Sequence, residues 1–231
     1  MIISIHQPNY LPYPGFFHKV IHSDVFIVQD VTKFDERFSN RNKIISSNKW
    51  TWLTVPIKKN HKEYQLRDVE IFNDLKWNKI HRKKLESAYN KSNFYNEYKT
   101  DLNSILEQKW ELLLELNMTL IKKIFEWLKI KTKIIYESEL EIKGEGTNRL
   151  INICKAIDAD VYLSGDMGHD YLNENIFESN NIKLEYQNYT PKKYEQILSE
   201  EFIPNLSIID MMFNLGNKQT YEKLKQGEIT K

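Results

Sequence analysis

The sequence predicts an α/β protein with a Rossmann-like, mainly parallel sheet, helices on both faces of that sheet and a helical insertion. Three observations support this prediction. Residues 1–30 have the pattern strand, short helix, strand; residues 131–231 alternate strands and helices again; and residues 73–130 between them are almost entirely helical in pattern. Parallel strands need long crossover connections, which are usually helices. We therefore expect one α/β domain over 1–231, with 73–130 as a helical insertion or subdomain.

An apolar strand at the N-terminus leads into a polar turn. Residues 1–5 are predicted to form this strand, and the turn that follows contains His6, Gln7 and three prolines, whose fixed φ angles limit its conformations. After a short aromatic helix, a second strand over 25–30 ends in Asp30. Ligands of open α/β sheets bind where strands end and helices begin, so this turn is a candidate binding site.

The helical stretch carries apolar side chains three and four residues apart from Leu102 to Leu128, which is the period of an amphipathic helix. Asn117 interrupts this apolar stripe. A buried amide must find hydrogen-bond partners. Two interpretations stay open for Asn117: a local hydrogen bond in the core, or a ligand contact from the helix face.

The remaining elements are predicted from short apolar runs and their flanking turn residues. We expect strands at 49–57, 132–136, 161–163 and 182–186, and helices over 147–157 and 170–179. Near the C-terminus, Ser207 and Asp210 have the spacing of a helix capping box, and Gly216 is a plausible end of that helix.

Composition restricts the class of protein. The chain has 231 residues, of which 41% are hydrophobic, and a net charge of +1. This balance argues against a dedicated duplex-DNA binder, which usually carries a strong basic excess. No signal-peptide pattern and no membrane-spanning apolar run is present, so we expect a cytoplasmic protein. The single cysteine, Cys154, lies on an apolar helical face and is expected to be a small core residue.

A parallel sheet would gather the residues that follow its strands at one edge: His6, Gln7, Asp30, Ser164, Gly165, Asp166 and Gln187. We expect His6 to act as the catalytic base, because a neutral imidazole accepts a proton near pH 7; the alternative is that it only holds the turn. Asp30 would orient His6, bind a sugar hydroxyl or hold a cation, or else cap the turn after its strand. Gly165 permits close backbone approach to a ligand.

A polar loop over 37–43 is rich in hydrogen-bond donors, among them Asn40, Arg41, Asn42 and Lys43. The planar guanidinium of Arg41 suits a phosphate or carboxylate group. The alternative is a solvated charged loop.

Other polar residues are assigned from their positions. Tyr194 and Gln196 precede the last helix and, with Asp210 in its first turn, could line a pocket. His18 and His22 have helical metal-ligand spacing, but no third ligand is apparent, and we expect them to face solvent. The run from 79 to 84, with its lysines, Arg82 and His81, is expected to be a solvated helix face. No nucleophile elbow, CxxC pair or HExxH motif occurs.

Several motifs together resemble the WbqC-like family, and they span nearly the whole chain. They are His6-Gln7-Pro8-Asn9-Tyr10-Leu11-Pro12, Gly15-Phe16-Phe17, Asp24 and Asp30, Asn40-Arg41-Asn42-Lys43-Ile44, Trp52-Leu53-Thr54-Val55-Pro56, Tyr162-Leu163-Ser164-Gly165, Tyr171-Leu172, Tyr194-Glu195-Gln196, Leu206-Ser207-Ile208-Ile209-Asp210 and Phe213-Asn214-Leu215-Gly216. Tyr13 is a mild departure, since the family often has tryptophan there. The resemblance implies a product of a bacterial surface-polysaccharide gene cluster, such as one for O-antigen. It also adds Tyr10 and Tyr171 to the candidate substrate-binding residues.

Three functions compete. The first is a transferase that modifies a nucleotide-linked amino sugar, with an acyl or aminoacyl donor, His6 as the base and Arg41 as an anion clamp. The second is an ATP-dependent ligase that forms an acyl-adenylate, because the layout of the first two strands superficially resembles nucleotidylyltransferases; the paired histidines of that group are missing here. The third is a non-catalytic protein that binds a sugar nucleotide, which the aromatic content suits. The sequence specifies no cofactor, metal or oligomeric state.

The predicted topology places the candidate residues in space. His6, Asp30, Ser164 and Asp166 should line one cleft at the carboxyl edge of the sheet. Arg41 should reach over this cleft from its loop, and Asn117 should approach it from the helical insertion. The diphosphate of a sugar nucleotide would then lie near Arg41 and its sugar near His6.

Overall fold

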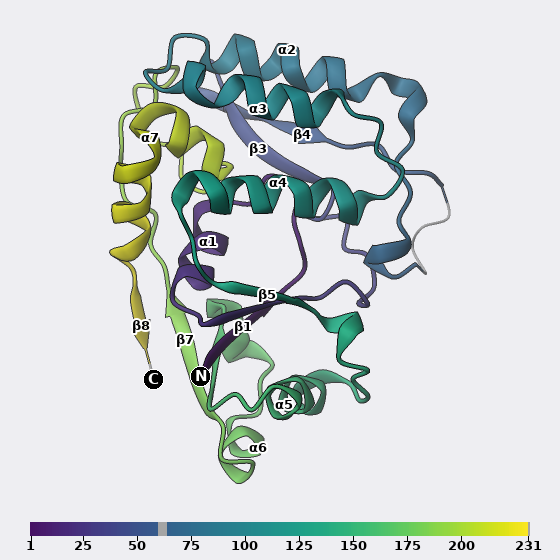
Figure 1. Cartoon of the computed structure of the whole chain (residues 1–231). Coiled ribbons are helices and arrows are strands. Elements are labelled where there is room, and N and C mark those ends of the chain that lie inside the picture. Colours follow the sequence, from purple (N-terminus) through teal and green to yellow (C-terminus); the bar gives the residue numbers. More distant parts are fainter. Residues whose placement is uncertain (60–63, 231) are drawn as a thin grey trace.

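A mostly parallel six-stranded sheet forms the centre of the protein. The structure is a computed structural model that describes residues 1–59 and 64–230. The strand order is β5-β2-β1-β6-β7-β8, and neighbouring strands are parallel except β7 and β8, which are antiparallel. This arrangement confirms the predicted Rossmann-like α/β fold (Figure 1). The strands are β1 (Ile2–His6), β2 (Val25–Val28), β5 (Lys133–Tyr136), β6 (Val161–Ser164), β7 (Lys183–Asn188) and β8 (Glu228–Thr230).

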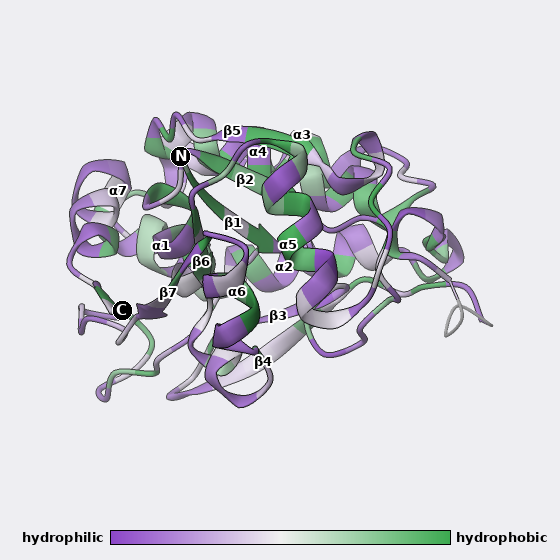
Figure 2. Ribbon diagram, turned by 90° about the horizontal axis from the view of Figure 1, so that it is seen from below, coloured by the Kyte–Doolittle hydropathy of each residue, from purple (hydrophilic) through white to green (hydrophobic). Residues whose placement is uncertain are grey.

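Helices cover both faces of this sheet (Figure 1). Successive side chains of a strand point to opposite faces, so Ile3 and Ile5 of β1 pack in one hydrophobic cluster and Phe26 of β2 packs in the other. The first cluster includes α5 (Gly146–Ala156) and α6 (Glu174–Ser179); the second includes α1 (Pro14–Ile21), α4 (Leu113–Leu128) and α7 (Ile208–Lys225). Figure 2 shows hydrophobic residues concentrated on the inner strands β1 and β2.

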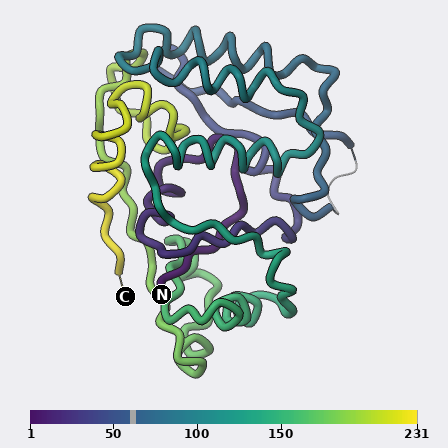
Figure 3. The backbone as a smooth tube through the Cα atoms, viewed as in Figure 1, coloured from purple at the N-terminus to yellow at the C-terminus, as the bar shows by residue number. Residues whose placement is uncertain are grey.

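Residues 73–130 are mostly helical, as the sequence pattern predicts, and Figure 3 follows the chain from the sheet into these helices and back. They form α2 (Trp77–Tyr89), α3 (Tyr95–Glu107) and α4. The apolar repeat from Leu102 to Leu128 is divided between α3 and α4, and in the connection Trp110 donates its indole N–H to the carbonyl of Ile105 at 2.8 Å. The description of 73–130 as an insertion within one domain stays a prediction.

A two-stranded antiparallel hairpin lies outside the sheet, formed by β3 (Arg41–Ser46) and β4 (Lys49–Thr54). Ser47 and Asn48 join the strands with φ angles of 39° and 59°, as a tight type I′ turn requires. β4 lies within the predicted strand 49–57. The predicted loop over 37–43 is wrong at its end, because Arg41 already begins β3. Residues 40–43 are all polar, so their sequence does not show the alternation of apolar and polar residues by which a strand is recognised, although their side chains alternate between buried and outward positions.

The other predicted elements occur within a few residues of their expected bounds, but two helix starts differ. α5 begins at Gly146, one residue before the expected start at 147. The capping box predicted at the start of α7 does not form: within residues 1–59 and 64–230 the Ser207 hydroxyl has no hydrogen-bond partner, and the Asp210 carboxylate accepts from other groups. Gly216 has non-helical backbone angles, φ 73° and ψ 174°, so the first helical segment of α7 ends there as predicted, and a second segment continues beyond the kink to Lys225.

Candidate functional site

The carboxyl edge of the sheet brings several predicted residues together. His6 is the last residue of β1, and the register of β1 against β6 pairs Ser4 with Leu163. Because these strands are parallel, His6 and Gly165 lie at the same edge. Asp30 follows the end of β2, which pairs with β1 on its other side. The predicted convergence at one edge therefore agrees with the topology.

His6 is held as a neutral imidazole. Its Nδ1 lies 2.8 Å from the carbonyl oxygen of Gln7, so Nδ1 carries the proton. The described part of the chain offers Nε2 no hydrogen-bond partner, and the ring packs edge-on against Phe16 at 5.3 Å. Burial, together with the positive charge of Lys19, lowers the pKa of His6 to about 3. The Nε2 lone pair is therefore available as a proton acceptor at neutral pH.

Lys19 is a site residue that the sequence interpretation missed. It lies on α1, is 4% exposed, and donates from Nζ to the carbonyl of Ile5 at 3.1 Å. Among the described residues it makes no ion pair, and burial lowers its pKa to about 7. Ser4 is on the same face of β1 as His6, and its buried hydroxyl has no hydrogen-bond partner among the described residues. A lysine in a helix of eight residues that consists mainly of aromatic and aliphatic residues was the available signal.

Asp30 is bound to the segment that follows β5. Its carboxylate accepts hydrogen bonds from the backbone N–H of Ser138 at 3.1 Å and from the Ser138 hydroxyl at 2.6 Å. Asp30 is 3% exposed. The hydrogen bonds of its side chain thus fix the start of the short 3₁₀ helix Glu137–Glu139, and none of them joins Asp30 to His6.

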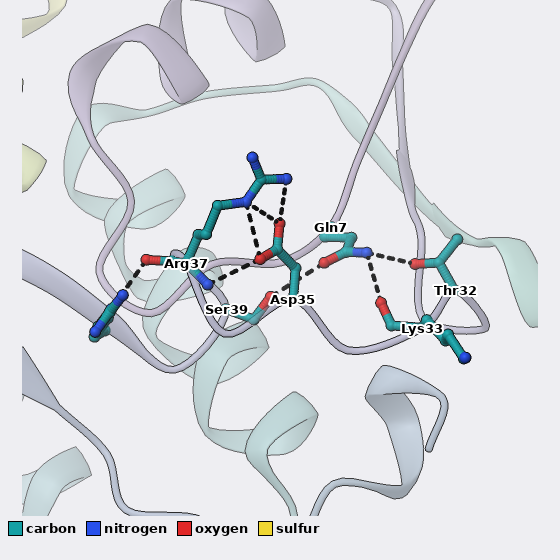
Figure 4. A network of polar contacts seen from close by, with 7 residues as sticks. Gln7, Thr32, Lys33, Asp35, Arg37 and Ser39 are labelled. Carbon is teal, nitrogen blue, oxygen red and sulfur yellow. Dashed lines mark hydrogen bonds and ion pairs between the residues drawn. The ribbon is translucent and has the colours of Figure 1, made fainter. Parts of the chain in front are cut away.

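Gln7 and Asn117 fix the turn that carries His6. Figure 4 shows the Gln7 amide donating to the Thr32 hydroxyl at 2.9 Å and to the Lys33 carbonyl at 3.0 Å, while its oxygen accepts from Ser39 at 3.1 Å. Asn117, fully buried on α4, donates to the carbonyls of Pro8 and Ser39 at 2.8 and 2.7 Å. Of its two interpretations, the core hydrogen bond is therefore made, and Asn117 does approach the turn from the helical stretch.

Tyr10 forms a buried hydrogen bond with His81, a histidine that was expected at the surface. His81 Nε2 lies 3.1 Å from the Thr54 carbonyl and so carries the proton, and the Tyr10 hydroxyl donates to Nδ1 at 2.9 Å. His81 is 3% exposed, and burial lowers its pKa to about 4. The expected solvated face is thus wrong for His81, whereas Lys79, Lys83 and Lys84 are exposed.

The solvent-facing position expected for His18 is also wrong. His18 is fully buried and accepts a hydrogen bond at Nδ1 from the Gln187 amide at 2.8 Å. Its neighbour His22 is only partly buried. The short helix α1 is covered on nearly every side by the sheet and α7, so even its polar residues are buried.

Residues 164–166 at the end of β6, which we call the β6 loop, lie beside the His6 turn at the same edge. Ser164 is buried and donates to the Gly165 carbonyl at 3.1 Å, while a Cβ placed on Gly165 would meet no atom of the described residues within 4 Å. Asp166 is exposed, and its charge contributes to the raised pKa of Tyr13, which follows mainly from burial. Tyr171, beyond the 3₁₀ helix Asp166–Asp170, is 67% exposed.

The polar residues of the hairpin divide by face. Asn40 and Asn42 point inward, where their amides donate to the carbonyls of Val55 and Leu11 at 2.9 and 2.8 Å. Arg41 and Lys43 point outward and lie over indole rings. The two asparagines therefore hold the hairpin against the core, and the two cations face solvent.

Asp210, Tyr194 and Gln196 form a separate buried cluster at the start of α7. The fully buried Asp210 carboxylate accepts from Tyr194 at 2.7 Å, from Gln196 at 3.1 Å and from Tyr89 at 2.9 Å. Burial raises the pKa of Asp210, although all three donors favour the charged form. Tyr89, on α2, was not predicted. These contacts join three distant segments, and none of them reaches His6.

The fold and this edge define the class: a Rossmann-like α/β protein with a neutral histidine at the carboxyl end of a central strand. The chain belongs to the WbqC-like protein family, whose model matches residues 7–222. It is 30% identical over 216 residues to the uncharacterised protein Rv1507c of Mycobacterium tuberculosis (strain ATCC 25618 / H37Rv), covering 93% of this chain and 94% of that protein. No solved structure matches the chain. Within the described residues, every helix is too short or too polar to cross a membrane.

Proposed function

We propose that the protein is a transferase that modifies a nucleotide-linked amino sugar, by acyl or aminoacyl transfer to the sugar amine, in the biosynthesis of bacterial surface glycan such as O-antigen. The observation that carries this proposal is the neutral His6 at the sheet edge, with its Nε2 lone pair unpartnered among the described residues. The surface-glycan context is what the resemblance to the WbqC-like family implies, and membership in that family supports it.

In the proposed reaction, the sugar amine attacks the acyl carbonyl carbon while His6 Nε2 takes the proton from the amine nitrogen. An N–C bond forms, the bond from the carbonyl to its carrier breaks, and His6 returns the proton to the leaving group. A base with a pKa near 3 is weak on its own. The negative charge of a diphosphate at this edge would oppose the effect of Lys19 and strengthen His6 as a proton acceptor.

The β6 loop suits the sugar. Gly165 leaves open space for a ring close to the backbone, and the exposed carboxylate of Asp166 can accept hydrogen bonds from sugar hydroxyls. Both residues follow the strand next to β1, so a sugar bound there has its amine within reach of the His6 turn.

The test begins with a thermal-shift screen of UDP-, dTDP- and GDP-linked amino sugars, because a ligand that binds the native state raises its melting temperature. Sugars that bind are then incubated with acetyl-CoA or with an aminoacyl thioester as donor, and products are identified by mass. A separate incubation with glycine and ATP tests the ligase alternative. We expect a modified sugar amine, and a loss of roughly 10²–10⁴-fold in turnover for His6→Asn.

The matched control is His22→Asn, at the opposite end of α1 from the sheet edge, which should keep full turnover. Full turnover by His6→Asn would remove the assigned role of His6. Binding of nucleotide sugars without any turnover would leave the non-catalytic alternative. Pyrophosphate release from ATP that requires His6 would favour the ligase.

A further inference from the structure

We propose that the outer face of the β3–β4 hairpin binds the nucleoside diphosphate part of the substrate, with the base stacked on Trp50 and the phosphates held by Lys43 and Arg41. We call Arg41, Lys43, Trp50 and Trp52 the hairpin platform. The inference rests on the proposed function, since it assigns a subsite to the nucleotide of the sugar nucleotide.

Large aromatic rings stand exposed on this face. Trp50 is 44% exposed, and its ring lies 5.3 Å from that of Trp52 at an interplanar angle of 77°. Phe38, 43% exposed, extends the aromatic surface beside Trp52 at 6.3 Å. Aromatic side chains of this kind are the surfaces on which nucleic-acid bases stack.

The two cations of the platform are held over indole rings rather than by carboxylates. Lys43 Nζ lies 4.4 Å from the Trp50 ring, and the Arg41 guanidinium lies 4.6 Å from the Trp52 ring. Neither residue makes an ion pair in the part of the chain that the structure describes. Arg37 nearby is different, because it pairs with Asp35 at 3.0 Å. The platform therefore presents two positive charges beside exposed rings, of which that of Arg41 is partly offset by the Asp35 carboxylate, whose pKa it helps to lower. This arrangement is complementary to a phosphate and its base.

The platform begins close to the His6 turn. Ser39, two residues before Arg41, binds the Gln7 side chain at 3.1 Å and accepts from the Tyr10 backbone through its carbonyl at 3.2 Å. From there β3 extends away from the edge, and Lys43 pairs with Trp52 across the hairpin. A nucleotide sugar laid along this strand would have its phosphates between the sugar at His6 and the base at Trp50.

The charge pattern favours a single nucleotide over a polynucleotide. Two cations match one diphosphate group, whereas a protein that tracks a nucleic-acid backbone places a longer basic stripe along it. The net charge of the whole chain is only +1.

The test measures binding by calorimetry with UDP, dTDP, GDP, inorganic pyrophosphate and a ten-nucleotide single-stranded DNA. We expect at least one nucleotide to bind the wild-type chain and to bind Trp50→Ala roughly 5- to 150-fold more weakly, the range that corresponds to loss of one base stack. Trp50→Phe should keep most of the affinity. Lys43→Met should weaken both the nucleotide and pyrophosphate, whereas Trp50→Ala should leave pyrophosphate unchanged.

The matched controls are Lys225→Met and Tyr221→Ala, which remove a cation–π pair of similar distance, 4.7 Å, from α7. These variants should bind as the wild type does. The proposal is overturned by a wild-type chain that binds none of the three nucleotides, by unchanged affinity in Trp50→Ala, or by DNA that binds more than tenfold more tightly than any nucleotide. Nucleotide binding at the platform without sugar modification would refute the proposed transferase activity but not the proposed binding at the platform. Sugar modification that is insensitive to Trp50→Ala would refute the proposed nucleotide binding at the platform but not the proposed transferase activity.

Discussion

The hydroxyl group of Tyr89 donates a hydrogen bond of 2.9 Å to the buried carboxylate of Asp210, across 121 positions of the sequence. The same hydroxyl accepts from the backbone N–H of Ile45 at 3.3 Å. One side chain therefore joins α2, the hairpin and the start of α7. Tyr194 and Gln196 complete the shell around the carboxylate.

Tyr89→Phe should destabilise the protein by about 1.5–3 kcal/mol, the usual size of a hydrogen bond to a charged group, because the buried carboxylate and the Ile45 N–H both lose a partner. Urea unfolding measures this change. Tyr95→Phe is the matched control: both rings pack on Phe213, at 5.0 and 5.2 Å, but the Tyr95 hydroxyl makes no described hydrogen bond. Equal losses of stability in the two variants would contradict the role given to Tyr89.

Asp210 should make stability depend on pH. Its folded-state pKa is raised above the ordinary value of 3.8, so the folded state holds this proton more tightly than the unfolded state does. The stabilisation is complete below pH 3.8 and is lost as pH rises through the raised folded-state pKa. The free energy of unfolding relative to Asp210→Asn should therefore fall as pH increases from 3.8 and then become constant. A difference that stays flat over this range would show that the pKa is not raised.

The sequence predicted the sheet and its edge better than the contacts made there. Apolar runs of three to six residues located β1, β2, β5, β6 and β7, and helical crossovers implied that they are parallel, which placed His6 and Gly165 at one edge. β8 was not predicted, since its short polar sequence becomes a strand only by pairing with β7.

Burial of polar side chains could not be read from local pattern. His81, Lys19 and His18 are polar residues whose burial depends on what the tertiary fold packs against their helices. Likewise, the partners of Asp210 come from positions far apart in sequence, so its spacing from Ser207 suggested a cap that the structure does not contain. Local signals located the elements, and long-range packing decided the roles of their polar residues.

Lys19 should also make stability depend on pH, in the opposite direction to Asp210. Its pKa is about 7 in the folded state and 10.5 ordinarily, so between these values the unfolded state binds more protons and stability rises with pH. Relative to Lys19→Met, the wild-type chain should gain up to about 1.4 kcal/mol per pH unit from pH 7 to 10. Urea unfolding of both proteins at matched pH measures this, and parallel curves would refute it. In the same variant, an NMR titration should show a higher pKa for His6, because a neighbouring positive charge is gone.

Gly165 and Gly216 should respond to alanine in different ways. A Cβ at Gly216 would lie 2.8 Å from the ring of Phe94, at a φ of 73° that side chains rarely adopt, so Gly216→Ala should destabilise the protein by about 1–3 kcal/mol or more. A Cβ at Gly165 meets no atom of the described residues within 4 Å, and its φ is −73°, so Gly165→Ala should change stability by less than about 0.5 kcal/mol.

The open space at Gly165 is the space assigned to the sugar, so the same methyl group should weaken binding of the nucleotide sugar while leaving binding of the free nucleotide unchanged. Calorimetry with both ligands on the two variants separates these effects. An unchanged affinity of Gly165→Ala for the nucleotide sugar would move the sugar away from the β6 loop.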